Sequence, residues 1–254
     1  MIFAIDIGNT NITIGCIDDQ ETYFTERISS DTKKTALEYA VILKSILEFQ
    51  NITPSQIEGS IISSVVPPIC QTISQAVERV LNKRPMIVGP GIKTGLSIKI
   101  ENPAQLGADM VVAAVGALER YSCPMIIFDL GTATTISVID KNRDFLGGMI
   151  TPGLRAATEA MNTSTAQLPV INLEPPKKVI GRNTIECMRS GIILGNACMI
   201  DGMITRIEEE LGEPATVIVT GGVARYVLPF CRKTIHYEDD LLLSGLHLIY
   251  TRNR

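Results

Sequence analysis

Two stretches of the chain combine a carboxylate, a glycine and small polar side chains at the end of an apolar run. The first reads Asp6-Ile7-Gly8-Asn9-Thr10-Asn11 and follows Phe3-Ala4-Ile5. Glycine lets a ligand approach backbone N–H groups, and Asn and Thr side chains add hydrogen-bond donors, so this turn suits a phosphate. A carboxylate repels phosphate unless a cation lies between them. The turn therefore predicts a bound phosphate together with Mg²⁺.

The same plan returns at Asp129, 123 positions after Asp6. An apolar run leads into Asp129-Leu130-Gly131-Thr132, and a run of alternating apolar residues follows, as it does after the first turn. Asp18 corresponds to Asp140 if the second turn is one residue shorter. Because the offset is close to half the chain length, the sequence predicts two homologous halves, residues 1–123 and 124–254, each opening with an acidic hairpin.

Composition excludes several classes of protein. The 254 residues are 45% hydrophobic and 20% charged, with a formal net charge of −4, which is typical of a globular protein. No cluster of Lys and Arg with interleaved aromatic residues occurs, so no nucleic-acid partner is expected. We recognise no signal peptide, and no apolar run reaches ~18 residues, so we expect no membrane association and a cytoplasmic location.

Six scattered cysteines, none in a Cys-x-x-Cys pair, are predicted to be reduced and mostly core residues. His236 and His247 have no partners at ligand spacing, so neither is assigned to a metal or to catalysis.

The elements that must position the acidic turns follow from apolar periodicity and from Gly, Pro and capping residues. Beyond the two hairpins we expect strands at 23–28, 60–66, 85–88, 145–150 and 215–219, and a loop-like segment over 89–108. We expect helices at 36–47, 69–81, 111–118, 154–161 and 240–250, and a long one after residue 184. Thr35 and Glu38 have the spacing of a capping box. This alternation is typical of an α/β fold with some parallel strand pairing.

Two glycine-containing segments outside the hairpins could contribute to a site. Gly107-Ala108-Asp109 leads into a helix, so Asp109 is either a helix-capping acid that stabilises by about 0.5–2 kcal/mol or a functional carboxylate. Thr220-Gly221-Gly222 ends a strand and allows backbone to lie flat against a ligand.

Three glycines, Gly191, Gly195 and Gly202, fall inside the predicted long helix and are expected to break it. Each costs about 1 kcal/mol relative to alanine, so we expect close packing, such as against another helix, to compensate.

Taken together, six motifs resemble those of the type III pantothenate kinases, in the same order and over nearly the whole chain. They are Asp6-Ile7-Gly8-Asn9-Thr10, Gly107-Ala108-Asp109, Asp129-Leu130-Gly131-Thr132, Gly147-Gly148-Met149-Ile150-Thr151-Pro152-Gly153, Gly181-Arg182-Asn183-Thr184 and Thr220-Gly221-Gly222. The resemblance implies an α/β architecture of the acetate-and-sugar-kinase/Hsp70/actin type. This architecture has two tandem ribonuclease-H-like domains, each a mixed sheet flanked by helices, with an ATP cleft between them. It also implies a homodimer whose interface completes the pantothenate pocket, which would give the glycine-marked helix a partner.

The resemblance also implies roles for individual residues. Asp109 matches the general base that accepts the proton of the pantothenate hydroxyl, and Asp129 matches the ligand of a monovalent cation, K⁺ or NH₄⁺. The residues that match ATP contacts are Asp6, Ile7, Gly8, Asn9, Thr10, Asn11, Ile12, Thr13, Gly131 and Thr132, with Gly221 and Gly222 on the adenosine side. The positions on the pantothenate side are Ile100, Gly107, Ala108, Met110 and Thr184.

Two positions depart from the family pattern. Met110 stands where the family usually has arginine, and Ile100 stands where it usually has tyrosine. Methionine offers neither the charge nor the hydrogen-bond donors of arginine. The residues that match ATP contacts therefore fit the family pattern better than the residues on the pantothenate side, here called the acceptor side.

Two alternatives to a pantothenate kinase therefore stay open: a kinase for another small hydroxyl compound, and a nucleotide-binding regulatory protein without transfer activity. A nuclease of ribonuclease-H type is less favoured because the sequence lacks a basic face. Phosphoryl transfer needs positioning and charge neutralisation rather than a Cys–His or Ser–His nucleophile, and no such nucleophile is visible.

Overall fold

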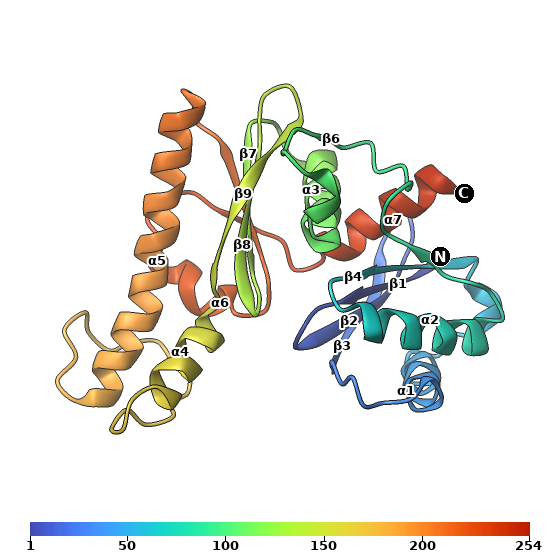
Figure 1. Ribbon diagram of the computed structural model, residues 1–254, viewed down its shortest axis with the longest axis horizontal. Helices are drawn as coiled ribbons and strands as arrows, with labels where there is room; N and C mark the ends of the chain where they lie inside the picture. The colour runs from blue at the N-terminus through green and yellow to red at the C-terminus, as the bar shows by residue number, and fades with distance from the viewer. The chain divides into compact units, whose positions relative to one another are not determined.

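The computed structural model describes all 254 residues, and the chain divides into two compact units (Figure 1). The first unit comprises Met1–Leu96, Glu101–Arg120 and Asp240–Arg254, and the second comprises Ser97–Ile100 and Tyr121–Asp239. These packing units assign residues differently from the predicted halves, because the last helix packs in the first unit and a short strand before residue 101 joins the second sheet. The predicted domain boundary at 123/124 stays a prediction about the repeat in the sequence.

The first unit is built on a five-stranded sheet of order β3-β2-β1-β4-β5. Its strands are β1 (Ile2–Ile7), β2 (Asn11–Ile17), β3 (Thr22–Ser29), β4 (Gly59–Ser64) and β5 (Met86–Ile87). The central strand β1 pairs antiparallel with β2 and parallel with β4. The predicted strands of this unit are confirmed to within two residues at each end.

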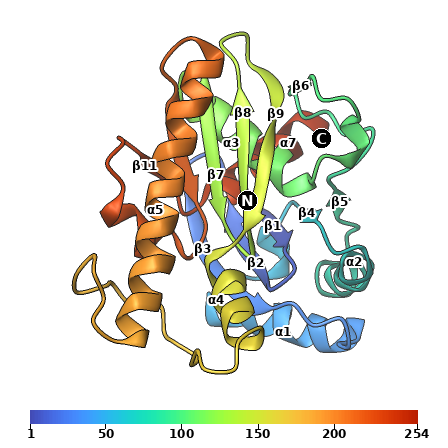
Figure 2. The ribbon, with the colours of Figure 1, turned by 60° about the vertical axis from the view of Figure 1, so that its left-hand side comes forward.

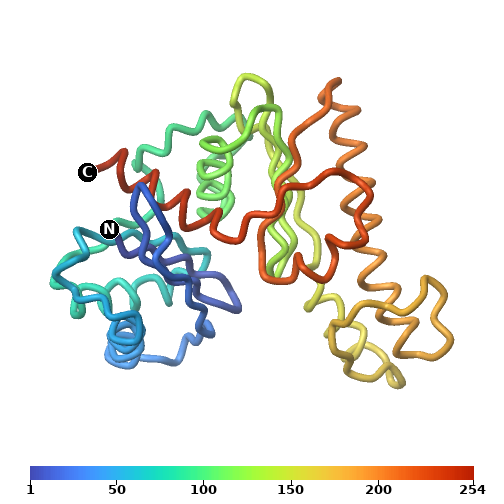
Figure 3. Tube along the Cα trace, turned by 180° about the vertical axis from the view of Figure 1, so that it is seen from behind, coloured from blue at the N-terminus to red at the C-terminus, as the bar shows by residue number.

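Helices cover both faces of this sheet. They are α1 (Ala36–Phe49), α2 (Pro67–Leu81), α3 (Ala108–Arg120) and α7 (Leu241–Asn253), with short 3₁₀ turns η1 (Pro54–Gln56) and η2 (Pro103–Gln105). Successive residues of a strand point to opposite faces. Phe3 and Ile5 accordingly pack in a core with α1 and α2, whereas Ile2 and Ala4 pack in a second core with α3 and α7. Both termini belong to this unit (Figure 3).

The start of α1 confirms the predicted capping box. The Thr35 hydroxyl accepts the N–H of Glu38 at 3.3 Å, and the Glu38 carboxylate accepts the N–H of Thr35 at 2.8 Å. Each side chain therefore satisfies a backbone donor that would otherwise lack a partner at the helix start.

The second unit holds a six-stranded sheet of order β11-β10-β7-β8-β9-β6. Its strands are β6 (Ser97–Ile98), β7 (Met125–Leu130), β8 (Ala133–Ile139), β9 (Asp144–Pro152), β10 (Thr216–Thr220) and β11 (His236–Tyr237). Its helices are α4 (Leu154–Thr163), α5 (Thr184–Leu211) and α6 (Ala224–Val227), followed by η3 (Leu228–Phe230). Figure 2 shows α5 running alongside the strands of this sheet. Strand β6 and η2 interrupt the predicted loop over 89–108.

The predicted repeat is present in the two sheets. Apart from β6, the second sheet has the order β9-β8-β7-β10-β11, which matches β3-β2-β1-β4-β5 in the first. Residues 8–10 separate β1 from β2, whereas only residues 131–132 separate β7 from β8, so the second turn is one residue shorter. Asp18 and Asp140 then occupy equivalent turns, and each carboxylate accepts the backbone N–H two residues later at 2.9 Å.

Helix α5 differs from its prediction in one respect. Its glycines do not break it, and it runs for 28 residues. A Cβ added at Gly191, Gly195 or Gly202 would meet no heavy atom within 4 Å. The expected close packing against these glycines is therefore absent within the chain.

The prediction that most cysteines lie in the core is wrong. All six are free thiols, but only Cys16 is buried, and Cys187 and Cys198 are exposed on α5. None of the helices combines the length and apolar character needed to cross a membrane.

Helices α3 and α7 pack closely at Gly116 of α3 and Gly245 of α7, where a Cβ would meet the backbone of the other helix. Their contact should therefore be sensitive to an added side chain. A Cβ at Gly245 would lie 2.0 Å from the Val112 carbonyl oxygen, whereas one at Gly89 would meet nothing within 4 Å. We expect Gly245→Ala to destabilise the protein by about 1–3 kcal/mol through overpacking, while the matched control Gly89→Ala changes stability by less than about 0.5 kcal/mol. Urea unfolding followed by circular dichroism measures both. Equal stabilities for the two variants would show that the helices can separate without cost.

Candidate active site

Asp6 lies near the carboxyl end of β1, between hydroxyl residues of the two neighbouring strands. Asp6 is in register with Thr13 on β2 and with Ser63 on β4. Residues in register on strands about 4.8 Å apart share a face of the sheet, so Thr13, Asp6 and Ser63 form a row, here called the first row. The row points to the α3 and α7 side of the sheet, because Ala4, two residues before Asp6, packs in that core.

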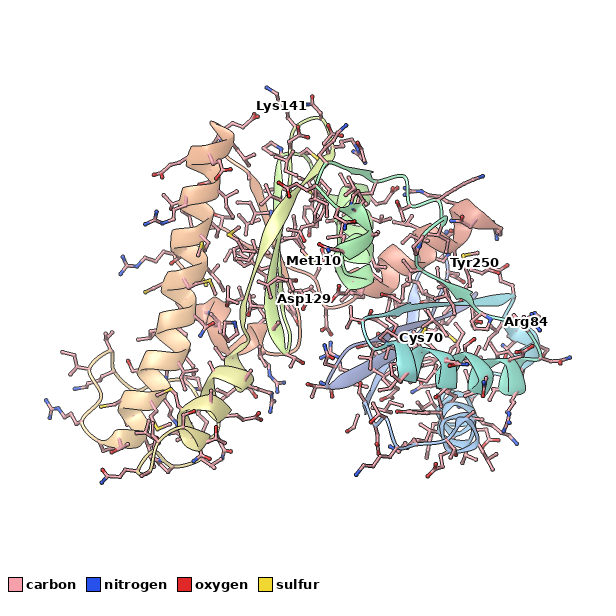
Figure 4. The ribbon with its side chains drawn as sticks, viewed as in Figure 1. Cys70, Arg84, Met110, Asp129, Lys141 and Tyr250 are labelled. Atoms are coloured by element: carbon pink, nitrogen blue, oxygen red, sulfur yellow. The ribbon has the colours of Figure 1, made fainter.

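The second sheet repeats this arrangement around Asp129, which is labelled in Figure 4. Asp129 on β7 is in register with Thr135 on β8 and with Thr220 on β10, and these three form the second row. Each aspartate is therefore flanked on both sides by a hydroxyl residue. The repeat predicted the two aspartates, but it did not predict Ser63, Thr135 or the hydroxyl of Thr220 as site residues.

The donor chemistry of the two rows fits the predicted cations. Carboxylate and hydroxyl oxygens are the hard ligands that Mg²⁺ and the alkali cations take. Ser63 and Thr220 are 0% and 1% exposed, and neither hydroxyl oxygen has a hydrogen-bond partner. Native proteins seldom leave such a group unpaired, so an oxygen-binding partner at each row is consistent with the structure.

The first turn is held by its own backbone and by Ser30. The Gly8 N–H donates to the Asn11 carbonyl at 3.0 Å, and the Ser30 hydroxyl donates to the Gly8 carbonyl at 2.6 Å. The predicted contacts Asn9, Thr10 and Asn11 are exposed around this turn. Ile7 and Ile12 were also predicted to contact ATP, but their side chains pack in the core, so only their backbone atoms could reach a ligand.

Three glycine-containing turns of the second unit lie against one another at the strand ends. The Gly153 N–H donates to the Thr132 carbonyl at 3.1 Å, and a Cβ at Gly153 would lie 2.3 Å from the Gly131 carbonyl oxygen. Gly221 has φ +102°, and its Cβ would lie 2.5 Å from the Leu130 carbonyl oxygen. Only glycine permits this approach of backbone to backbone. The structure thus brings Gly131, Thr132 and Gly221 together and adds Gly153, which the sequence placed in a motif but not in the site.

A cavity of about 690 Å³ in the second unit is lined by α4, by the extended segment 170–175 and by Tyr226 of α6. Helix α4 starts directly after Gly153, and Tyr226 lies four residues after Gly222, so the walls of the cavity continue from the glycine turns. Its volume is in the range of small-molecule sites.

Asp109 lies in the first turn of α3, as the second residue of the helix. Its Oδ1 accepts the N–H of Met110 at 2.8 Å. A Cβ at Gly107 would lie 2.4 Å from the same oxygen, so the carboxylate folds back over Gly107 and would have to move if a side chain stood there. Burial raises the pKa of the Asp109 carboxyl, and the hydrogen bond from Met110 offsets this only in part. The start of a helix favours a negative charge and would by itself lower this pKa, so burial outweighs the helix start at Asp109.

The positions predicted on the acceptor side are divided between the two units. Ala108 and Met110 belong to the start of α3, and Met110 is almost fully buried (Figure 4). Ile100 follows β6, and its Cγ2 lies 3.8 Å from the position of a Cβ at Gly147. Thr184 is the exposed first residue of α5, whose N-terminus is capped by Asn183.

Comparison with known proteins decides the family. The family model for type III pantothenate kinase matches residues 2–206. The chain belongs to the type III pantothenate kinase family. A type III pantothenate kinase from an Exiguobacterium species is 46% identical over 254 residues, which cover all of both chains. The resemblance of the six motifs is thereby confirmed.

Solved structures confirm the fold. Component A of the (R)-2-hydroxyglutaryl-CoA dehydratase of Acidaminococcus fermentans superposes with a TM-score of 0.58 at 14% identity, covering 98% of this chain and 97% of that one. The ROK hexokinase of Thermus thermophilus gives 0.51 at 12% identity, covering 98% of each chain. At such low identity these likenesses show the fold alone, and they agree with two tandem ribonuclease-H-like domains.

Membership of this kinase family implies the use of ATP. The glycine turns of the second unit, the adjacent cavity and the exposed polar turn of the first unit are the features that suit it, since a nucleoside needs a concave pocket and phosphates need backbone and side-chain donors.

We expect Asp109→Asn to remove most turnover and to leave the fold at least as stable at neutral pH. Loss of a general base costs about 10²–10⁴ in rate. Because the folded pKa is raised, the ionised carboxylate costs stability above that pKa, and this cost is absent below about pH 4, where aspartate is also protonated in the unfolded chain. Initial rates and urea unfolding between pH 4.5 and 8 measure both effects. An asparagine variant that is less stable at pH 7 and keeps its turnover would assign Asp109 a purely structural role.

Proposed function

We propose that this chain transfers a phosphoryl group from ATP to the hydroxyl of pantothenate, giving 4′-phosphopantothenate in the first step of coenzyme A biosynthesis. Membership of the type III pantothenate kinase family supports this function over the full length of the chain. The structural observation that carries it is the partly buried carboxylate of Asp109 in the first turn of α3, whose raised pKa suits a group that must take up a proton during the reaction.

The first unit contributes phosphate contacts and the base. The exposed side chains of Asn9 and Asn11 would donate hydrogen bonds to phosphate oxygens. Asp109 keeps its Oδ1 on the Met110 N–H, so Oδ2 would receive the proton of the acceptor hydroxyl. Mg²⁺ bound at Asp6 would neutralise the charge that develops on the phosphates.

The second unit contributes the nucleoside side and a second cation. The backbone at Gly131, Thr132, Gly221 and Gly222 would lie against the phosphates and the ribose, with the adjoining cavity available to the base. Asp129 would hold the monovalent cation, K⁺ or NH₄⁺. Positioning and electrostatic stabilisation are the contributions that phosphoryl transfer requires of a protein.

The acceptor side is where this chain departs from its family. Without an arginine at position 110, no fixed positive charge stands at the start of α3 to meet the carboxylate of pantothenate. A charge-assisted hydrogen bond contributes about 1.5–3 kcal/mol, or roughly 10–150-fold in affinity. We therefore expect a raised KM for pantothenate and an ordinary KM for ATP.

The test measures ADP release with and without pantothenate. In wild type, ADP release should depend on pantothenate, and Met110→Arg combined with Ile100→Tyr should lower the KM for pantothenate by about 10-fold or more without changing the KM for ATP. Ile100→Tyr alone is the control for the added bulk. ATP binding without pantothenate-dependent ADP release in either protein would favour a different acceptor or a regulatory role.

We also propose that the protein is a homodimer formed through α5. Cys187, Gly191, Gly195, Cys198 and Gly202 recur at spacings of three and four, so they form one exposed stripe of small residues along this helix. A Cβ at any of its glycines would meet nothing in the chain. The equivalent helix of a second copy could approach this stripe closely and offset the cost of the glycines.

We expect Gly195→Glu to convert a dimer into a monomer, because it would place a charge in the centre of the helix contact. Gly89→Glu introduces the same charge at an open glycine of the first unit and should leave the dimer intact. Sedimentation velocity over a range of protein concentrations measures both. A dimer that persists in the Gly195 variant would move the interface away from α5.

A further inference from the structure

Two of the buried hydroxyls without a hydrogen-bond partner occupy equivalent places in the repeated sheets. Ser63 on β4 is in register with Asp6 on β1, and Thr220 on β10 is in register with Asp129 on β7. In both sheets the strand concerned pairs in parallel with the central strand on the side away from the hairpin. The same unpaired group therefore stands beside the same carboxylate in each unit.

Both positions are unfavourable for the isolated chain. A buried hydroxyl without a partner destabilises a protein, and replacing it by an apolar group of the same shape is neutral or stabilising. Such exceptions point to a role or to a bound water or ion. Ser60, three residues before Ser63, also has an unpaired buried hydroxyl, but it is in register with Phe3 and so lies on the opposite face of β4.

We infer that Ser63 and Thr220 are oxygen donors of the two cation sites, Ser63 for Mg²⁺ at Asp6 and Thr220 for the monovalent cation at Asp129. This inference rests on the proposed function, which assigns the cations to those aspartates. A carboxylate and a hydroxyl in register supply two oxygens on one face of a sheet, the donor type that both cations take. Rotation about χ1 between staggered positions re-aims each hydroxyl without moving the backbone.

The surroundings of Ser63 agree with this role. Ser63 lies on the face of the sheet that α3 covers, and a Cβ at Gly107, next to the start of α3, would lie 3.8 Å from Cγ1 of Val65. The end of β4 and the turn that precedes Asp109 are therefore neighbours within the first unit. A cation shared by Asp6 and Ser63 would lie on the same side of the sheet as the helix that carries Asp109.

The experiment follows cation binding by stability and needs no turnover. The melting temperature is measured with a non-hydrolysable ATP analogue while Mg²⁺ or K⁺ is titrated at constant ionic strength. Loss of one ligand or of its support weakens metal binding by about 10–100-fold. Ser63→Ala should raise the Mg²⁺ midpoint by that factor and leave the K⁺ midpoint unchanged, and Thr220→Val should do the reverse. Thr220→Ser, which keeps the hydroxyl, should restore the K⁺ midpoint.

Ser60→Ala is the matched control, since it removes an equally buried, unpaired hydroxyl from the same strand on the other face. It should raise the melting temperature and move neither midpoint. If Ser63→Ala and Thr220→Val behave like Ser60→Ala, the inference is wrong.

Two further variants separate this failure from failure of the proposed function. Asp6→Asn should raise the Mg²⁺ midpoint, and Asp129→Asn should raise the K⁺ midpoint. If the aspartate variants shift the midpoints and the hydroxyl variants do not, Asp6 and Asp129 bind the cations, and Ser63 and Thr220 are not among the ligands. If neither set shifts a midpoint, the assignment of cations to Asp6 and Asp129 is wrong as well.

Discussion

The register of the central strand in each sheet is the constraint on which the rest of this structure depends. Strands β1 and β7 carry apolar residues toward both faces, and each ends in an aspartate followed by one more buried residue and a glycine turn. A shift of one residue would send Asp6 into the α1 and α2 core and Ile5 to the opposite face. The buried apolar residues that stabilise each sheet therefore also fix where its carboxylate points.

The same pairing explains why hydroxyl residues gather around these carboxylates. Parallel neighbours in register share a face, so Ser63 and Thr220 are brought beside Asp6 and Asp129 by the strands that complete each sheet. In the second unit, backbone contacts also hold the neighbouring turns in place, because Gly153 and Gly221 pack directly against the end of β7 and the turn that follows it. Side chains at Gly153 and Gly221 would separate the turns, so the positions of the three turns at Gly131, Gly153 and Gly221 depend on one another.

Two effects act in opposite directions on the charge of the Asp109 carboxylate. The start of a helix favours a negative charge, yet burial dominates and raises the pKa of this carboxyl. Burial of the ionised carboxylate destabilises the folded chain, and it occurs where Gly107 leaves room for the carboxylate to fold back. Natural sequences tend to break local rules at functional sites, and the partly buried carboxylate of Asp109 agrees with the role proposed for it.

The sequence by itself determined the order of the longer helices and strands, the capping box at Thr35, the repeat of the Asp6 and Asp129 hairpins and the family motifs, whereas β6, α6 and β11 were not predicted. These are local patterns of apolar spacing, glycine and capping chemistry, and they can be interpreted without knowing what packs against them. Only the tertiary structure decided which residues flank the carboxylates, that Ile7 and Ile12 turn their side chains into the core, and that α5 leaves its glycines uncovered. Strand order and register bring together residues such as Asp6 and Ser63 that are far apart in sequence, and no local pattern encodes that pairing.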